Sequence, residues 1–241
     1  MKRITRRCTL LCVGALLALA LLGTSCAKKE VAVTPPWEIG EKSVFQVTQD
    51  GTVLATWEMR VDPDEAGIAL VSELRGEGFS EIARVKVDPR SLLPEAVSFL
   101  QETELTKAGY TATYTMDEAI VTPEPPAGSP DVPVTRIDIP EGPHFENESL
   151  VMILRALPLK KGLRATLTDV VTRTGTVASV DVKVTREETI TTVLGELKCY
   201  VVELVGFSQA VWIAKDSPHQ ILRFENEAAK TVSELTEYVP K

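Results

Sequence analysis

Alternation of apolar and polar side chains with a period of two residues is the feature that most constrains the fold of this chain. One alternating set consists of Val53, Ala55, Trp57, Met59 and Val61. Residues 42–49 precede this run, and Asp50-Gly51 joins the two segments. Because a two-residue hairpin turn needs positive φ at both central positions, an Asp-Gly pair between two alternating runs predicts a β-hairpin.

Strand-like patterns continue along most of the chain. Residues 67–87 read as two strands joined by Gly76-Glu77-Gly78, and residues 197–205 form a nearly continuous apolar run, typical of a central strand covered on both faces. Inward-facing positions of a further strand are predicted at Ala178, Val180, Val182 and Val184. Further strands are predicted at 95–101, 110–116, 163–172, 176–185, 210–214, 220–225 and 231–238.

One helix is predicted, at about residues 146–157. Its apolar stripe, at the spacing i, i+3, i+4, i+7, consists of Leu150, Ile153, Leu154 and Leu157. Asn147 or Ser149 is the expected N-cap, and Pro158 ends the helix. At least nine strands and one helix predict a mainly β fold, either a curved antiparallel sheet or an open β-barrel wrapped around the helix.

Residues 122–143 interrupt the strand pattern with seven prolines. Since proline lacks the backbone donor and fixes φ, neither a strand nor a helix is expected to persist there. The Pro-rich loop is either a lid or docking loop, or a solvated excursion between two halves of one sheet, and the second interpretation is preferred.

The N-terminus resembles a bacterial lipoprotein export signal. A basic cluster precedes the uncharged run Leu10–Leu22, which spans only about 20 Å as a helix, short of a bilayer core of roughly 30 Å. Leu22-Gly23-Thr24-Ser25-Cys26 resembles a lipobox, although Gly23 stands where Leu is commonest. We expect cleavage after Ser25 and attachment of lipid, including fatty acyl chains such as palmitate, to Cys26. Ordinary secretion with cleavage at Ser25 or Ala27, and an uncleaved anchor, are the alternatives.

The expected organisation is therefore a signal peptide at 1–25, a lipidated tether at 26–36 and a single β-rich domain at 37–241. The expected location is the bacterial cell envelope, on the non-cytoplasmic side of a membrane. Loss of residues 1–25 removes four basic and no acidic residues, which takes the net charge from −8 to −12. That acidity opposes nucleic acid and anionic lipid surfaces as partners.

Little in the sequence points to catalysis. Cys8 and Cys12 lie inside the expected signal, so one thiol, Cys199, remains and an intramolecular disulfide is excluded. Cys199 lies in an apolar strand and is interpreted as a buried structural thiol. His144 and His219 are expected in loops without spaced partners, so no metal site is predicted. No motif for a nucleotide, a cofactor or a nucleophile is present, and an enzyme is not expected.

Three other side chains have positions that could serve a ligand site. Glu203 interrupts the most apolar strand and is expected either to orient a ligand or to form an ion pair with Arg223 or Lys198, at a position that water reaches. Trp57 and Trp212 are interpreted as core or rim aromatics that could also line a groove.

The C-terminal half carries a family resemblance in three segments. They are the helix that ends Leu154-Arg-Ala-Leu-Pro158, the turn and strand 192–203, and Val211–Pro218 followed by Ile221–Phe224. In this order they resemble the exported bacterial domain-of-unknown-function 3108 family. The resemblance implies a fold similar to half-open-barrel lipoprotein carriers, which bind acyl chains in their concave face. The family has no assigned activity, so no catalytic residue is carried over.

Two functions follow as expectations. The first is a lipid-anchored, non-enzymatic module that binds an apolar or amphiphilic ligand in the concavity of the sheet. The second is a structural or protein-interaction lipoprotein with a solid barrel, which docks an envelope protein through its edge strands or through the Pro-rich loop.

Overall fold

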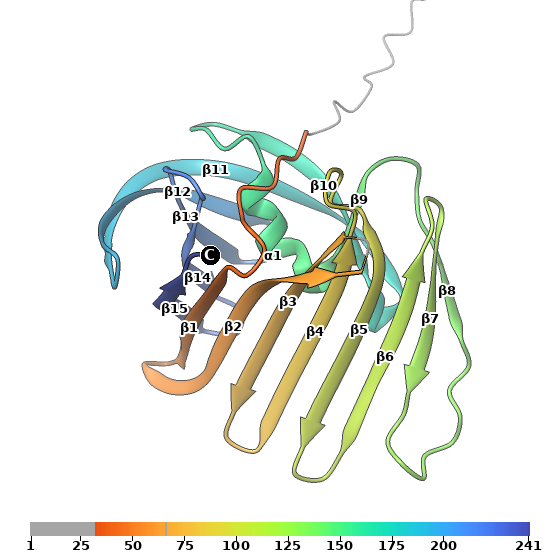
Figure 1. Cartoon of the computed structure of the whole chain (residues 1–241). Helices are drawn as coiled ribbons and strands as arrows, with labels where there is room; N and C mark the ends of the chain where they lie inside the picture. The colour runs from red at the N-terminus through yellow and green to blue at the C-terminus, as the bar shows by residue number, and fades with distance from the viewer. Residues whose placement is uncertain (1–31, 66) are drawn as a thin grey trace, which may run out of the picture.

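A single large sheet dominates the computed structural model, which describes residues 32–65 and 67–241 (Figure 1). The strands are β1 Lys42–Gln49, β2 Thr52–Asp64, β3 Gly67–Gly76, β4 Phe79–Val87, β5 Pro94–Thr103, β6 Lys107–Tyr114, β7 Glu118–Glu124, β8 Thr135–Asp138, β9 His144–Glu146, β10 Arg164–Val171, β11 Thr176–Thr192, β12 Gly195–Val205, β13 Gln209–Ala214, β14 Ile221–Asn226 and β15 Thr231–Val239. Their order across the sheet is β8-β7-β6-β5-β4-β3-β2-β1-β15-β14-β13-β12-β11-β10-β9. The prediction of a mainly β fold is confirmed.

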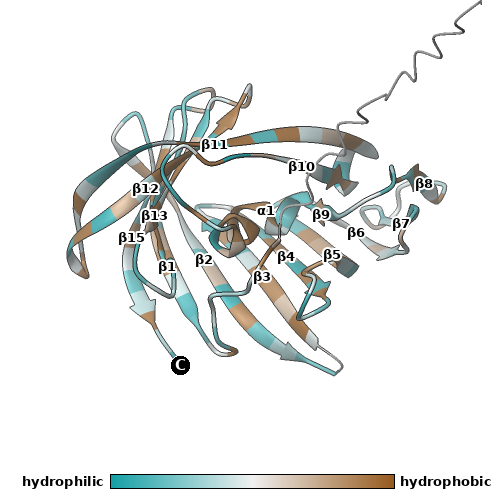
Figure 2. Cartoon of the chain, turned by 90° about the horizontal axis from the view of Figure 1, so that it is seen from above, coloured by the Kyte–Doolittle hydropathy of each residue, from teal (hydrophilic) through white to brown (hydrophobic). Residues whose placement is uncertain are grey.

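The sheet consists of two meanders that meet where the first and last strands pair, β1 against β15. Among the described strands, only β9 and β10 pair in parallel; all other neighbours are antiparallel. The two edge strands, β8 and β9, are joined by residues 139–143 alone. Because so short a connection must bring the two edges close together, the sheet curls into an open barrel (Figures 1 and 2).

The hairpins form where turn chemistry predicted them. Asp50 and Gly51 both have positive φ, +49° and +82°, between β1 and β2. Gly78, at φ +73°, lies in the turn between β3 and β4. These turns lie at the lower end of the barrel in Figure 1, with the β5–β6 turn beside them, and residues 32–37 enter at the opposite end.

The helical segment lies inside the curl of the sheet (Figures 1 and 2). It consists of a 3₁₀ turn Asn147–Ser149, the α-helix α1 Leu150–Ile153 and a second 3₁₀ turn Leu154–Ala156. The expected N-cap was wrong: the carboxylate of Glu146 accepts from the backbone N–H of Glu148 at 2.6 Å, whereas the side chain of Asn147 binds Asp169. The single apolar stripe was also too narrow a description, because almost every side chain from 150 to 157 is buried.

The prediction for residues 122–143 was wrong in part. Strand β7 continues to Glu124, and β8 pairs with it over Val121 and the three residues before it. Pro123 lies beyond that pairing, so it has a neighbouring strand on one side only, opposite Tyr110 of β6. Proline is tolerated in such a position because one side of the strand needs no donor. The irregular loop is therefore residues 125–134.

The ends of the expected domain also differ in detail from the prediction. Residues of the expected tether contact the domain, since the N–H of Thr34 donates to the carbonyl of Ala156 at 2.9 Å and Val33 packs on the core. The signal 1–25, Ser25 and Cys26 lie outside the described residues. No helix in the described ranges is both long and apolar enough to cross a bilayer. Among the described residues the core members lie between Val33 and Tyr238, and a chain that begins at residue 27 contains all of these.

Candidate functional site

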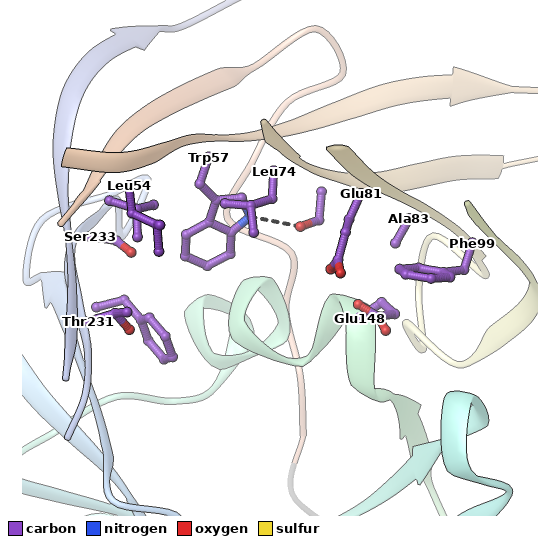
Figure 3. Close-up of a pocket in the computed structure, with 12 residues that line it drawn as sticks. Leu54, Trp57, Leu74, Glu81, Ala83, Phe99, Glu148, Thr231 and Ser233 are labelled. Carbon is purple, nitrogen blue, oxygen red and sulfur yellow. Dashed lines mark hydrogen bonds between the residues drawn. The ribbon is translucent and has the colours of Figure 1, made fainter. Parts of the chain in front are cut away.

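A groove of about 270 Å³ lies between the concave face of the sheet and the helical segment (Figure 3). Its lining comes from β1 to β5, β14, β15 and the start of the helical segment: Val47, Leu54, Trp57, Ser72, Leu74, Glu81, Ala83, Phe99, Glu148, Phe224, Thr231 and Ser233. The volume is near the lower end of the roughly 300–1,000 Å³ typical of small-molecule pockets.

The groove runs across the strands. Cross-strand pairing places Glu81, Leu74, Trp57 and Phe45 in one row on the same face of four neighbouring strands, and Ser233 of β15 pairs with β1 one step further. Four inter-strand steps of about 4.8 Å make this row roughly 19 Å long. The volume is therefore distributed along a long, narrow channel.

The middle of the groove is apolar and aromatic. The ring of Trp57 lies 5.5 Å from that of Phe45 and 5.7 Å, edge-on, from that of Phe224. Its indole N–H donates to Ser72 Oγ at 2.8 Å (Figure 3). Because its one polar atom is satisfied, Trp57 presents an apolar ring to the channel. Leu54, which is 41% exposed, lies where the channel meets solvent near the β1–β2 turn.

The two ends of the groove differ in chemistry. Thr231 and Ser233 supply hydroxyl groups at one end, and the carboxylates of Glu81 and Glu148 lie at the other end, beside Phe99 (Figure 3). Arg173 bridges the two carboxylates, with Nη2 3.1 Å from Glu148 and 3.4 Å from Glu81.

The acidic end is partly shielded from water. The guanidinium of Arg173 also covers the ring of Phe99 at 4.1 Å. Burial raises the pKa of Glu148 despite the opposing effect of Arg173.

A buried polar layer lies behind the acidic end. It consists of His144 and Glu146 on β9 and Asp169 on β10, all nearly inaccessible to water. Burial raises the pKa of Glu146 well above its usual value and that of Asp169 to about 6, and it lowers the pKa of His144.

The polar layer orients the start of the helical segment. Asp169 accepts from the amide of Asn147 at 3.0 Å, and Glu146 is the N-cap. Within the described ranges, no cluster of three or more His, Cys, Asp or Glu side chains is arranged to hold a metal ion.

Comparison with known proteins agrees with the sequence resemblance. Residues 44–230 match the family described as Protein of unknown function (DUF3108). The chain belongs to this family. No curated protein matches it. Among solved structures it is similar to a crystal structure described as a beta-barrel-like protein of domain of unknown function DUF1849 from Brucella abortus, with 8% identity over 88% of this chain and 99% of that chain and a TM-score of 0.49.

In this DUF3108 domain the helical segment and the β13–β14 turn meet at Arg155. This arginine of the helical segment is buried, and its Nη1 lies 2.5 Å from the equally buried carboxylate of Glu41. Its Nε and Nη2 donate to the carbonyls of His219 and Pro218, both at 2.9 Å. The helix is thereby fixed to the turn between β13 and β14. Sequence analysis missed Glu41, because nothing local marks a partner that is 114 residues away.

Most sequence-selected residues lie away from the groove. Cys199 is fully buried and donates to the carbonyl of Glu188, and burial, followed by the charge of Glu188, raises its thiol pKa to about 11. The interpretation of a structural thiol agrees with this environment. His219 lies in a loop as expected, but placing His144 in a loop was wrong, since it is buried in β9.

Glu203 and Trp212 lie on the outer face of the sheet, opposite the groove. Glu203 is paired at 3.8 Å with Arg186 and not with the expected Arg223 or Lys198. The indole N–H of Trp212 donates to Glu188, and both residues 203 and 212 border an outer hollow of about 430 Å³. The rest of that hollow is lined by residues at and beside the β12–β13 turn, among them Gly206 and Ser208, and by several charged groups, so it lacks the apolar lining of the inner groove. Of the two tryptophans, Trp57 alone lines the inner groove.

Proposed function

We propose that this chain is a lipid-anchored lipoprotein of the bacterial envelope whose DUF3108 domain is a non-enzymatic binding module for an apolar or amphiphilic ligand. The supporting observation is the groove between the helical segment and the sheet, with Trp57, Leu74 and Phe224 along its middle. Apolar channels with a few polar groups at their ends are typical of sites for small amphiphiles.

Binding is tested with the chain from residue 27 and the neutral fluorescent probe N-phenyl-1-naphthylamine, alongside native mass spectrometry. We expect saturable probe fluorescence, which Leu74→Glu abolishes because it places a charge in the apolar middle of the groove. Leu105→Glu is the matched control: Leu105 is 94% exposed in the β5–β6 turn and does not line the groove. Equal loss in both variants, or no binding by the wild type, would refute the proposal.

Anchoring is a separate part of the proposal, supported by the lipobox-like segment that ends at Cys26. Growth of an expressing bacterium with an alkyne-bearing fatty acid should label the wild type and not Cys26→Ser. Labelling of both to the same extent would contradict lipid attachment at this residue.

A second candidate is docking of an envelope protein at the edge of the sheet. It is favoured by the loop 125–134, which exposes Val132 and Val134 and leads into β8, the edge strand that pairs with β7 alone among the described strands. Deletion of 125–134, which spares β7 and β8, should abolish crosslinking to a partner in intact membranes if this loop is the dock. A crosslinked product that survives the deletion places the partner elsewhere.

A further inference from the structure

The charges along the groove are of one sign. Its twelve lining residues include two carboxylates, Glu81 and Glu148, and no lysine, arginine or histidine. Among the residues that the structure describes, Arg173 is the one cation paired with these two carboxylates, and it is shared between them. An anionic head group would meet repulsion here, whereas a cation would be attracted.

The carboxylates have room for a further donor. Glu81 Oε1 accepts from the amide of Gln101 at 2.8 Å, and its Oε2 contacts Arg173 only at the longer distance of 3.4 Å. Both lining carboxylates remain partly open to water. An ammonium group, with three donors on one compact charge, suits this arrangement better than a hydroxyl, which neutralises no charge.

The shape of the groove restricts the apolar part of the ligand. The channel is roughly 19 Å long, while its volume is about 270 Å³, so one linear chain fits it better than a fused ring system. From the carboxylates such a chain passes Leu74 and Trp57 (Figure 3). It then reaches Phe224, which is the cross-strand partner of Ser233.

We propose that the groove is selective for an amphiphile with one linear apolar chain and a cationic amino head group, which binds between Glu81 and Glu148. This inference rests on the proposed binding function and specifies the class of its ligand. The chain lies along the aromatic middle of the groove, and the amino group completes the acidic end that Arg173 neutralises only in part.

The test is displacement of N-phenyl-1-naphthylamine from the chain that begins at residue 27. Three competitors of equal chain length are compared below their micelle-forming concentrations: dodecylammonium, dodecanoate and the uncharged dodecyl maltoside. We expect dodecylammonium to displace the probe at concentrations about tenfold lower than dodecanoate at neutral pH and low salt, and we expect added salt to narrow that difference. Dodecanoate competing as well as dodecylammonium would overturn the inference.

Variants assign the preference to the two carboxylates. In Glu81→Gln/Glu148→Gln the preference for dodecylammonium should be lost or reversed, since both carboxylates are neutralised and the charge of Arg173 then stands without its partners. The affinity of the neutral probe is measured in the same variant, and the two competitors are compared relative to it. Glu77→Gln/Glu104→Gln makes the same change in net charge at two turn residues outside the groove and should keep the full preference. A preference that survives in the groove variant, or is lost equally in the control, would refute the assignment.

The two levels of the proposal fail differently. If the wild type does not bind the neutral probe, or if the wild type and Leu74→Glu bind it equally well, the groove is not a binding site and the proposed function fails. If the probe binds in the groove but head-group charge makes no difference, only the inference about the amino group fails. The salt dependence of the wild type provides a readout that does not depend on any variant folding.

Discussion

Replacement of Arg155 by methionine should destabilise the protein more than any exposed charge substitution. The guanidinium is 2% exposed and its partner Glu41 is 4% exposed, with 2.5 Å between them. Two further donors of Arg155 satisfy the carbonyls of Pro218 and His219. Methionine preserves much of the side-chain volume, so the lost interactions are mainly polar.

The expected loss of stability follows from the charge of Glu41, which stays buried without its partner in this variant. Removing one partner of a buried ion pair typically costs about 3–5 kcal/mol, because the other charge is left uncompensated. With an m-value of about 2.5 kcal/mol/M in urea, a loss of about 4 kcal/mol lowers the midpoint by about 1.5 M. Glu41→Met/Arg155→Met should lose less than the sum of the two single variants, because neither charge is then left alone.

Urea unfolding followed by circular dichroism measures these differences, and Arg75→Met is the matched control. Arg75 also pairs with a glutamate, Glu73, but its side chain is 70% exposed, so its loss should cost under about 1 kcal/mol. If Arg155→Met and Arg75→Met shift the midpoint equally, the buried pair does not hold the helical segment in place and the reasoning is wrong.

Three further predictions test the buried groups. The thiol of Cys199 should react with a disulfide reagent only after unfolding, because burial raises its pKa to about 11; rapid reaction of the folded protein at neutral pH would contradict its placement. Burial raises the pKa of Asp169 from 3.8 to about 6, so the folded state binds its proton more tightly, and stability should rise by up to about 3 kcal/mol as pH falls through 6 towards 4. Asp169→Asn should flatten that rise in urea titrations at several pH values, and an unchanged pH profile would refute the assignment. Gly109→Ala should destabilise the protein by more than about 2 kcal/mol, since a Cβ there would lie 2.3 Å from the carbonyl oxygen of Phe99. Ala108→Ser, at the neighbouring position, should be nearly neutral. Similar urea midpoints for the two variants would contradict this close approach of the strands.

Local patterns were sufficient to predict most of the strands and the helical segment, but not β7, β8 and β9. The alternation in β2 and the Asp50-Gly51 turn depend on neighbours in sequence, so they could be interpreted without the structure. The same is true of the spacing that predicts a helix near residues 150–157. These patterns do not show which element packs against each buried face.

The sequence-based predictions were wrong where segments that are distant in the sequence determine the environment of a residue. His144 and Glu146 are buried because β9 pairs in parallel with β10, more than twenty residues later in the chain. Pro123 is accommodated because β8 stops short of it. The groove itself joins side chains from eight separate segments, and of its lining only Trp57 could be proposed from the sequence as a groove residue.

The helical segment explains why several polar groups are buried in this domain. From Asn147 to Ala156 it has ten residues, fewer than the roughly 12–15 that an isolated helix needs to be stable in water. Its stability must therefore come from tertiary contacts, which are the apolar side chains buried along its length and the polar contacts at its two ends. Arg155 fixes one end to Glu41 and to the β13–β14 turn, while the N-cap Glu146 and the bond from Asn147 to Asp169 fix the other.

These two attachments hold the helical segment at a set distance from the sheet, and that distance determines the width of the groove. A helix that packed directly on Trp57 and Leu74 would bury more apolar surface but leave no channel. The buried polar contacts oppose that collapse, because moving the segment inward would break hydrogen bonds in an environment where water cannot replace them. The groove is therefore formed without a ligand, and the binding proposed for it would require no folding of the helical segment.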